Sequence, residues 1–126
     1  MAEAQKGAAR PEDITRLFVE RANARDAEGL AALYEPDAVL GYPPGQVTQG
    51  RDAILALYEQ MVARGLRFKL EEAVPVVRNG DLALTATHRA DGAGIRVQVV
   101  RRQSDGTWLR VIDLPEPPPP RSVDGS

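Results

Sequence analysis

Apolar residues recur at helical spacing in the first half of the chain and alternate with polar residues in the second half. After Pro11, which suits a first helical turn, apolar side chains return every three or four residues and predict a helix. These side chains are Ile14, Leu17, Phe18 and Ala22. Asp26 is a typical N-cap residue and predicts a short second helix that ends at Pro36. The buried side of that helix would consist of Leu30, Leu33 and Tyr34.

The next segment predicts a strand, a turn and a third helix. Residues 37–41 have the pattern of a strand, the sequence YPPG at 42–45 is a turn, and residues 46–49 can pair back. A helix over 51–63 follows Gly50, and Gly65 is placed to adopt the left-handed conformation at its end. The apolar stripe of this helix would be Ile54, Leu57, Tyr58 and Met61.

The remainder of the chain predicts four consecutive strands. They are expected near 66–77, 81–89, 95–103 and 107–114, separated by Gly-containing turns. Pro75 inside the first of these strands indicates a bulge or an edge position. Three helices followed by antiparallel strands predict an α+β fold, in which the helices pack on one face of a curved, mostly antiparallel sheet. A cavity between the helices and the sheet is expected from this arrangement.

Length and composition narrow the picture further. The 126 residues suit a single domain over 11–114, with a flexible arm at 1–10 and an extended Pro-rich tail at 115–126. A net charge of -2 argues against nucleic acid as a partner. The single histidine and the absence of cysteine offer no convincing metal set, and no cofactor is expected. The chain has neither the apolar core of a signal peptide nor a membrane-spanning run, so we expect a cytoplasmic location and no membrane partner.

Three segments in sequence order carry a resemblance to a known superfamily. They read DAEGLAALYEPDAVL, then PPG followed by GRDAI, and finally DGTWLRVID. Their order over residues 12–114 resembles the nuclear-transport-factor-2-like superfamily, with its cone-shaped cystatin-like fold, and within it the SnoaL-like and ketosteroid-isomerase-like domains. The resemblance implies a pocket for a small, largely apolar molecule. It also implies a homodimer formed through the outer face of the sheet, with Trp108, Arg110, Ile112, Thr85, Thr87 and Arg101 on that face.

The resemblance also places the catalytic positions of the ketosteroid isomerases on this chain. The general-base position falls at Tyr42, the oxyanion tyrosine near Phe18 and the oxyanion aspartate near Gln98. None of the three catalytic residue types is present at these positions. Dienol chemistry by the isomerase mechanism is therefore not expected, although Gln98 keeps an amide N–H to donate.

Strand alternation predicts which other side chains face the cavity. Within 82–88, one face carries Leu82, Leu84, Ala86 and His88, and its apolar character makes it the expected cavity face. Within 107–114, Leu109, Val111 and Asp113 share a face, and the family resemblance implies that this face points toward the cavity. The predicted polar cluster is therefore His88, Gln98 and Asp113, with Tyr42 at the hairpin side and Tyr58 on the third helix.

Each candidate has a functional and a structural interpretation. Asp113 would act as a base or anchor a ligand hydroxyl, or it would form an ion pair with Arg96 or Arg110. His88 would exchange a proton near neutral pH, or lie idle at a strand end. The hydroxyls of Tyr34, Tyr42 and Tyr58 would serve a ligand, or Tyr34 and Tyr58 would belong to the core and Tyr42 to the turn. The amide of Gln98 would serve a ligand, or lie on the solvent-facing surface.

Two functions follow as hypotheses. The chain is either a cofactor-independent enzyme that moves a proton, as in isomerisation, cyclisation, dehydration or epoxide opening, or a non-catalytic ligand-binding or accessory protein. The absent isomerase residues favour the second hypothesis, and the mixed apolar and polar cavity face favours the first.

Overall fold

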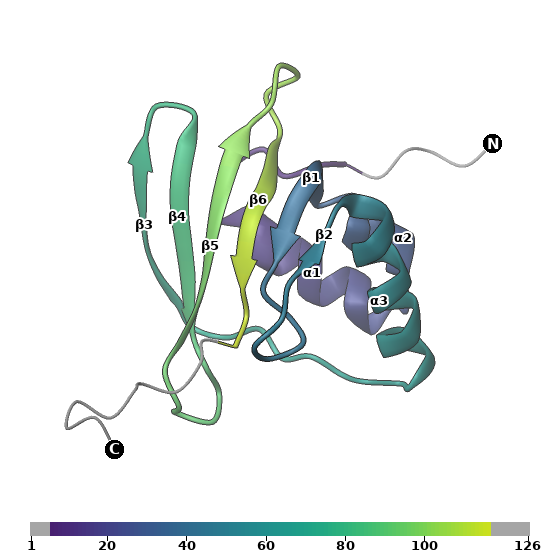
Figure 1. Cartoon of the computed structure of the whole chain (residues 1–126). Coiled ribbons are helices and arrows are strands. Elements are labelled where there is room, and N and C mark those ends of the chain that lie inside the picture. The colour runs from purple at the N-terminus through teal and green to yellow at the C-terminus, as the bar shows by residue number, and fades with distance from the viewer. Residues whose placement is uncertain (1–5, 117–126) are drawn as a thin grey trace, which may run out of the picture.

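The computed structural model describes residues 6–116, and Figure 1 shows their arrangement. Three helices and six strands follow one another along the chain. The helices are α1 (Asp13–Asn23), α2 (Ala27–Ala31) and α3 (Arg51–Ala63). The strands are β1 (Tyr34–Leu40), β2 (Thr48–Gln49), β3 (Ala73–Asn79), β4 (Leu82–His88), β5 (Ile95–Arg102) and β6 (Trp108–Leu114).

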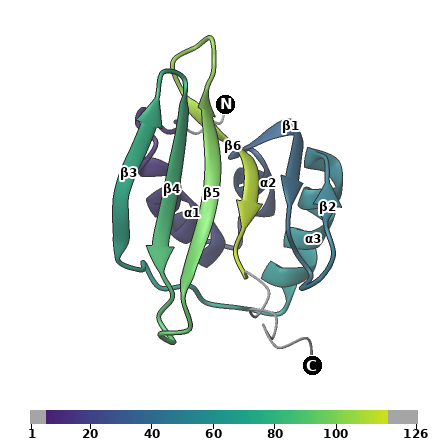
Figure 2. The same cartoon turned by 60° about the vertical axis from the view of Figure 1, so that its left-hand side comes forward.

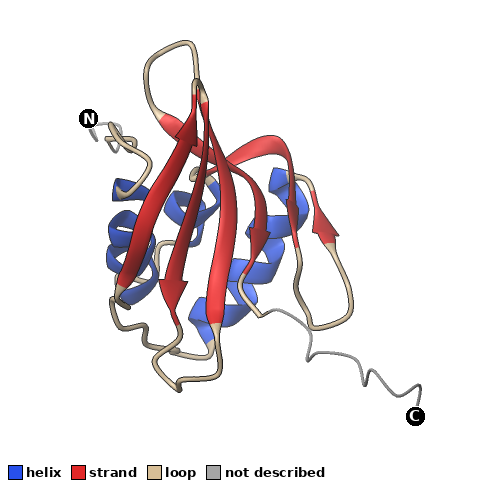
Figure 3. Ribbon diagram, turned by 90° about the vertical axis from the view of Figure 1, so that its left-hand side faces the viewer, coloured by secondary structure: helices blue, strands red, loops and turns tan. Residues whose placement is uncertain are grey.

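The strands form one sheet in the order β2-β1-β6-β5-β4-β3. Only β1 and β6 run parallel, and every other neighbouring pair is antiparallel. All helices lie on one side of the sheet (Figure 2), and the strands curve around them without closing into a barrel (Figure 3). The predicted α+β fold, with three helices packed on a curved and mostly antiparallel sheet, is confirmed.

Local sequence signals explain the helix boundaries. Asp26 caps α2, because its Oδ1 accepts a hydrogen bond from the Gly29 backbone N–H at 2.9 Å. Gly50 precedes α3 with a φ of 91°, and Gly65 follows its end with a φ of 71°. Both are left-handed backbone conformations that glycine adopts without steric cost. The predicted cap and the predicted helix over 51–63 are confirmed.

Two segments differ from the prediction. The second helix ends earlier than expected, and Tyr34 opens strand β1 instead of completing a helix. Residues 64–72, which we call the strap, join α3 to β3 without helix or strand, where a strand had been predicted from residue 66. The backbone of Phe68 is held by the Asn23 side chain, which donates to its carbonyl at 2.9 Å and accepts from its N–H at 2.8 Å. These bonds take the place of a strand partner.

The prediction for Pro75 is confirmed in both of its forms. Strand β3 lies at the edge of the sheet, and its pairing with β4 shifts between Val74 and Val77. Because proline has no N–H for the ladder, it fits an edge strand at an irregularity.

The predicted cavity face of β4 is wrong. Ala83, Thr85 and Thr87 are the buried, helix-facing side chains, whereas Leu84 is 43% exposed on the outer face. His88 is also exposed, at the end of the strand. The alternation was read correctly, but its phase was assigned by hydrophobicity. Ala and Thr side chains lie on the concave side, where Thr85 bonds to Gln98 and Thr87 bonds to Glu71, and the leucines lie on the convex side.

Strand β6 changes its phase partway along. Val99 pairs with Ile112 while Val100 pairs with Arg110, so Val111 is an extra residue in the ladder. The bulge brings Arg110 and Asp113 to the same helix-facing side, and both are buried. The predicted face of Leu109, Val111 and Asp113 is therefore wrong, although Asp113 itself does face inward.

The bulge also revises the predicted dimer face. Trp108, Arg110, Thr85 and Thr87 are buried in the monomer, while Ile112 and Arg101 are exposed. Trp108 packs in the core, and its backbone N–H donates to the Ala8 carbonyl at 2.9 Å, so the inner end of the predicted 1–10 arm is attached to the domain. Residues 1–5 and 117–126, which include most of the predicted tail, lie outside the described residues.

Candidate functional site

A cavity of about 590 Å³ lies between the helices, the strap and the concave side of the sheet. Its size is in the range of pockets that hold small organic molecules. Apolar side chains from α1, β1, α3 and the strap form much of its wall: Phe18, Val19, Leu40, Leu57, Met61, Leu66 and Phe68. Phe18 contacts Tyr58 and Phe68 edge to face, with ring centroids 5.7 and 5.5 Å apart. The helix side of the cavity is therefore aromatic and aliphatic.

The sheet side of the cavity holds a buried polar network. The Tyr34 hydroxyl donates to Asp113 Oδ2 at 2.5 Å and lies 2.7 Å from the Tyr58 hydroxyl. A hydroxyl has one proton, so Tyr58 must donate to Tyr34. Arg110 Nη1 lies 3.1 Å from the Tyr34 oxygen and 3.3 Å from Asp113 Oδ2. The network thus runs from Tyr58 through Tyr34 to Asp113, with Arg110 alongside.

The burial of this network fixes its protonation. Burial, and then the charge of Asp113, raise the pKa of Tyr34 and of Tyr58 well above the ordinary value, so both phenols stay protonated near neutral pH. Burial alone would lower the pKa of Arg110, but the attraction of Asp113 outweighs it and the pKa is raised. Arg110 also lies over the Phe18 ring, with its guanidinium carbon 4.9 Å from the centroid. Arg110 is therefore a permanent cation in this wall.

Two atoms of the network have no hydrogen-bond partner within residues 6–116. They are Asp113 Oδ1 and Arg110 Nε, and both are fully buried. Leaving a buried polar atom unpaired costs roughly 1–3 kcal/mol. Both residues line the cavity. The network therefore carries an unused acceptor and an unused donor next to the pocket.

Gln98 adds a further polar group on β5. It pairs across the sheet with Thr85 on one side and Asp113 on the other, so the three side chains form one row. The Gln98 amide oxygen accepts a hydrogen bond from the Thr85 hydroxyl at 2.8 Å. Gln98 is buried and lines the cavity, where its amide N–H groups are the remaining donors.

A second polar cluster forms one end of the cavity. Glu71, on the strap, accepts hydrogen bonds from Arg96 Nε at 2.8 Å, the Thr87 hydroxyl at 3.1 Å and the Ala90 backbone N–H at 3.0 Å. Arg96 also donates to the Pro115 carbonyl at 2.8 Å. Burial would raise the pKa of Glu71, but the bonds from Arg96 and Ala90 outweigh it and the pKa is lowered. Glu71 thus attaches the strap to the sheet as a carboxylate.

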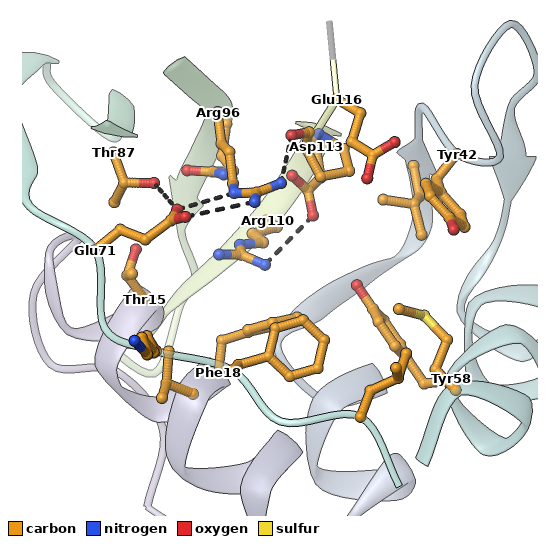
Figure 4. Close-up of a pocket in the computed structure, with 18 of the residues that line it drawn as sticks. Thr15, Phe18, Tyr42, Tyr58, Glu71, Thr87, Arg96, Arg110, Asp113 and Glu116 are labelled. Atoms are coloured by element: carbon orange, nitrogen blue, oxygen red, sulfur yellow. Dashed lines mark hydrogen bonds and ion pairs between the residues drawn. The ribbon is translucent and has the colours of Figure 1, made fainter. Parts of the chain in front are cut away.

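Figure 4 shows how these groups share the pocket. Glu71, Thr87 and Arg96 gather at one end, and the side chains of Tyr42 and Tyr58 lie at the other. Arg110 and Asp113 lie between the two ends, across the cavity from Phe18. The charged pair is therefore central, and a bound molecule would lie between it and the aromatic wall.

The structure places the predicted site residues in two groups. Phe18, Tyr42, Tyr58, Gln98 and Asp113 line the cavity. The others are not among its lining residues: Leu84, Ala86, His88, Leu109 and Val111. All of the second group come from the two strands whose phase was misjudged, so the imidazole and the carboxylate do not meet.

The roles of Glu71 and Phe68 are not evident from the sequence. The hydroxyl of Tyr34 is a candidate there, but its bond to Asp113 is not predicted, and Arg110 is one of two alternative partners for Asp113. Tyr34 was assigned to a helix because it continues the apolar spacing after Leu30. Glu71 and Phe68 fall in the predicted strand near 66–77, but the strand begins only at Ala73 and both residues belong to the strap. The spacing of Arg110 and Asp113, three residues apart, signals one face only if a bulge lies between them. Within residues 6–116, no three His, Cys, Asp or Glu side chains are arranged to hold a metal ion.

Comparison with known proteins agrees with this architecture. The model of the SnoaL-like domain family matches residues 15–113, most of the chain. The chain therefore belongs to the SnoaL-like domain family. A search of curated proteins finds no match. Among the described residues no helix is long and apolar enough to cross a membrane.

Solved structures show the same fold. A candidate calcium/calmodulin-dependent protein kinase type II association domain from Thiobacillus denitrificans is 22% identical with a TM-score of 0.70, over 90% of this chain and all (100%) of its own. A ketosteroid isomerase-like protein from Erwinia carotovora is 22% identical with a TM-score of 0.64, over 81% of this chain and 88% of its own. A candidate dehydratase of the nuclear-transport-factor-2-like family from Streptomyces avermitilis is 19% identical with a TM-score of 0.60, over 81% and 89%. The predicted SnoaL-like domain is confirmed by the family match, and the predicted cystatin-like fold by the solved structures.

Proposed function

We propose that this protein binds a small, largely apolar molecule in its cavity and transfers a proton to and from it without a cofactor. The observation that carries the proposal is the buried Asp113 Oδ1, which has no hydrogen-bond donor among the described residues. A ligand hydroxyl, amine or acidic C–H directed at this atom would supply the missing partner. Phe18, Tyr58 and Phe68 would hold the apolar body of the ligand, and Gln98 would donate to a ligand oxygen.

Asp113 is the base in this proposal, and Arg110 and Tyr34 are positioning residues. Both donate to Oδ2, which leaves Oδ1 as the oxygen that can accept. Their hydrogen bonds hold the carboxylate in one orientation in the wall of the cavity, and proton transfer requires a base that is held in place. The relatives described as ketosteroid isomerase-like and as a candidate dehydratase support chemistry of this general class.

One observation favours a second function, ligand binding without turnover. His88, the predicted proton partner, lies exposed outside the cavity, so Asp113 would have to take and return the proton alone. The buried contact with Arg110 also pairs the carboxylate with a permanent cation, as in a structural ion pair. In this second function Asp113 would accept a hydrogen bond from the ligand and hold it in place, and no covalent bond of the ligand would be made or broken.

The experiment compares wild type with Asp113→Asn, and with Asp37→Asn as a control for an exposed carboxylate on β1. Hydrophobic enones, epoxides and hydroxylated polyketide-like compounds are screened by thermal shift, since a ligand that binds only the folded state must raise stability. Ligands that bind are then assayed for turnover. Folding of each variant is checked by circular dichroism.

We expect Asp113→Asn to abolish turnover, while Asp37→Asn retains it. Binding by wild type with no turnover of any ligand would favour the non-catalytic reading. Equal turnover by wild type and Asp113→Asn would contradict the role of Asp113. If no compound alters the thermal stability of wild type, the proposed pocket function is wrong.

A further inference from the structure

The strap contributes three of the seven charged side chains that line the cavity. Five of its residues line the pocket: Leu66, Arg67, Phe68, Lys69 and Glu71. Phe68 supplies an aromatic contact to Phe18, and two cations flank it in sequence. Arg67 and Lys69 are exposed, so they lie at the rim of the cavity, while Phe68 lies deeper.

Two of the acidic side chains that line the cavity already form ion pairs with arginines. Glu71 is paired with Arg96 at 2.8 Å, and Asp113 is paired with Arg110 at 3.3 Å. Within residues 6–116, Arg67 and Lys69 form no ion pair, and the remaining acidic lining residue, Glu116, forms none either. The rim therefore presents two uncompensated positive charges against one negative charge, in a chain whose net charge is -2.

We propose that the ligand is an amphipathic acid. Its apolar body would lie between Phe18 and the sheet, and its carboxylate, sulfonate or phosphate would lie at the rim, between Arg67 and Lys69. This inference rests on the proposed pocket function and adds the charge of the ligand to it. A cationic ligand would meet two like charges at the rim and find Glu116 alone as a partner, which is why the acid is favoured.

Two fluorescent probes with the same body test the inference. N-phenyl-1-naphthylamine is neutral, and 1-anilinonaphthalene-8-sulfonate carries one added sulfonate. Both are titrated against wild type, the double variant Arg67→Gln/Lys69→Met, and Arg64→Gln, which removes an exposed cation just before the pocket-lining part of the strap. Met61→Trp narrows the cavity and reports whether a probe binds inside it.

We expect wild type to bind the sulfonate probe more tightly than the neutral probe. The double variant should weaken binding of the sulfonate probe about threefold to tenfold, the range for two exposed ion pairs. Binding of the neutral probe should not change, Arg64→Gln should behave as wild type, and added salt should reduce the preference for the sulfonate. Met61→Trp should weaken both probes.

The outcomes separate this inference from the proposed function. If both probes bind in the cavity with equal affinity and the double variant changes neither, the ligand charge is wrong and the apolar pocket remains. If neither probe binds, or if Met61→Trp affects neither of them, the pocket function itself is contradicted and the inference falls with it.

Discussion

Arg110→Met tests whether the buried network is as tightly coupled as its geometry indicates. The side chains of Arg110 and Asp113 are 5% and 3% exposed, so solvent does not screen their interaction. Methionine keeps much of the apolar stem over Phe18 but removes the cation. The Asp113 carboxylate is then left buried with Tyr34 as its donor within the described residues.

The expected loss is about 3 kcal/mol of unfolding free energy, at the lower end of the roughly 3–5 kcal/mol found when one partner of a buried ion pair is removed. The lower end applies because the Tyr34 hydroxyl still donates to Oδ2. Asp113→Leu should cost a similar amount, because it leaves the guanidinium buried. The double variant Arg110→Met/Asp113→Leu should cost about 2 kcal/mol less than the sum of the single variants, since no unpaired charge remains.

Urea denaturation of wild type, the two single variants and the double variant measures these changes in unfolding free energy. Arg102→Met, which removes an exposed arginine on β5, serves as the control and should change stability by less than about 1 kcal/mol. Additive costs in the double variant, or a loss below about 1 kcal/mol for Arg110→Met, would show that the two side chains are hydrated or do not interact. The network described above would then be wrong.

Two further outcomes are expected. The pKa of Glu71 is lowered on folding, so its contribution to strap attachment is fully present above its ordinary value of 4.5 and is lost as the pH falls through the lower folded value. Glu71→Gln should speed dissociation of N-phenyl-1-naphthylamine at pH 7 in stopped-flow measurements severalfold, with Glu72→Gln as control, and equal rates would refute the attachment. The predicted homodimer should use the outer row in which Leu84, Val99 and Ile112 lie side by side on β4, β5 and β6. Light scattering should show a dimer that Ile112→Glu dissociates, and a wild-type monomer at micromolar concentration would contradict it.

The sequence predicted the elements of this fold better than the direction of their side chains. The cap at Asp26 and the helix between Gly50 and Gly65 depend on neighbours within a few residues, so local patterns suffice. The concave face of β4 depends on what packs against it. Apolar alternation indicated the leucines, but the concave side carries Ala and Thr side chains, whose hydroxyls bond to Gln98 and to Glu71 on the strap.

The candidate site shows the same limit more sharply. Regular alternation grouped Asp113 with Leu109 and Val111, and the family resemblance placed that shared face inward. Asp113 does face inward, but because of a bulge that the alternation did not include. Arg110 was assigned to the outer face for the same reason. A β-bulge in β6 cannot be predicted from a local sequence pattern, because the bulge is defined by the pairing of β6 with β5, which is a separate strand. Tyr34 joined the site through contacts with residues 24 and 79 positions away in the chain.

The bulge at Val111 has a consequence for comparing members of this family. The extra residue in β6 determines whether both Arg110 and Asp113 point into the interior. A relative with the same residue letters but a regular ladder would turn either its arginine or its aspartate to the exterior. A sequence alignment would then match positions that lie on opposite sides of the sheet. Functional residues therefore have to be assigned across the family from the strand pairing of each structure.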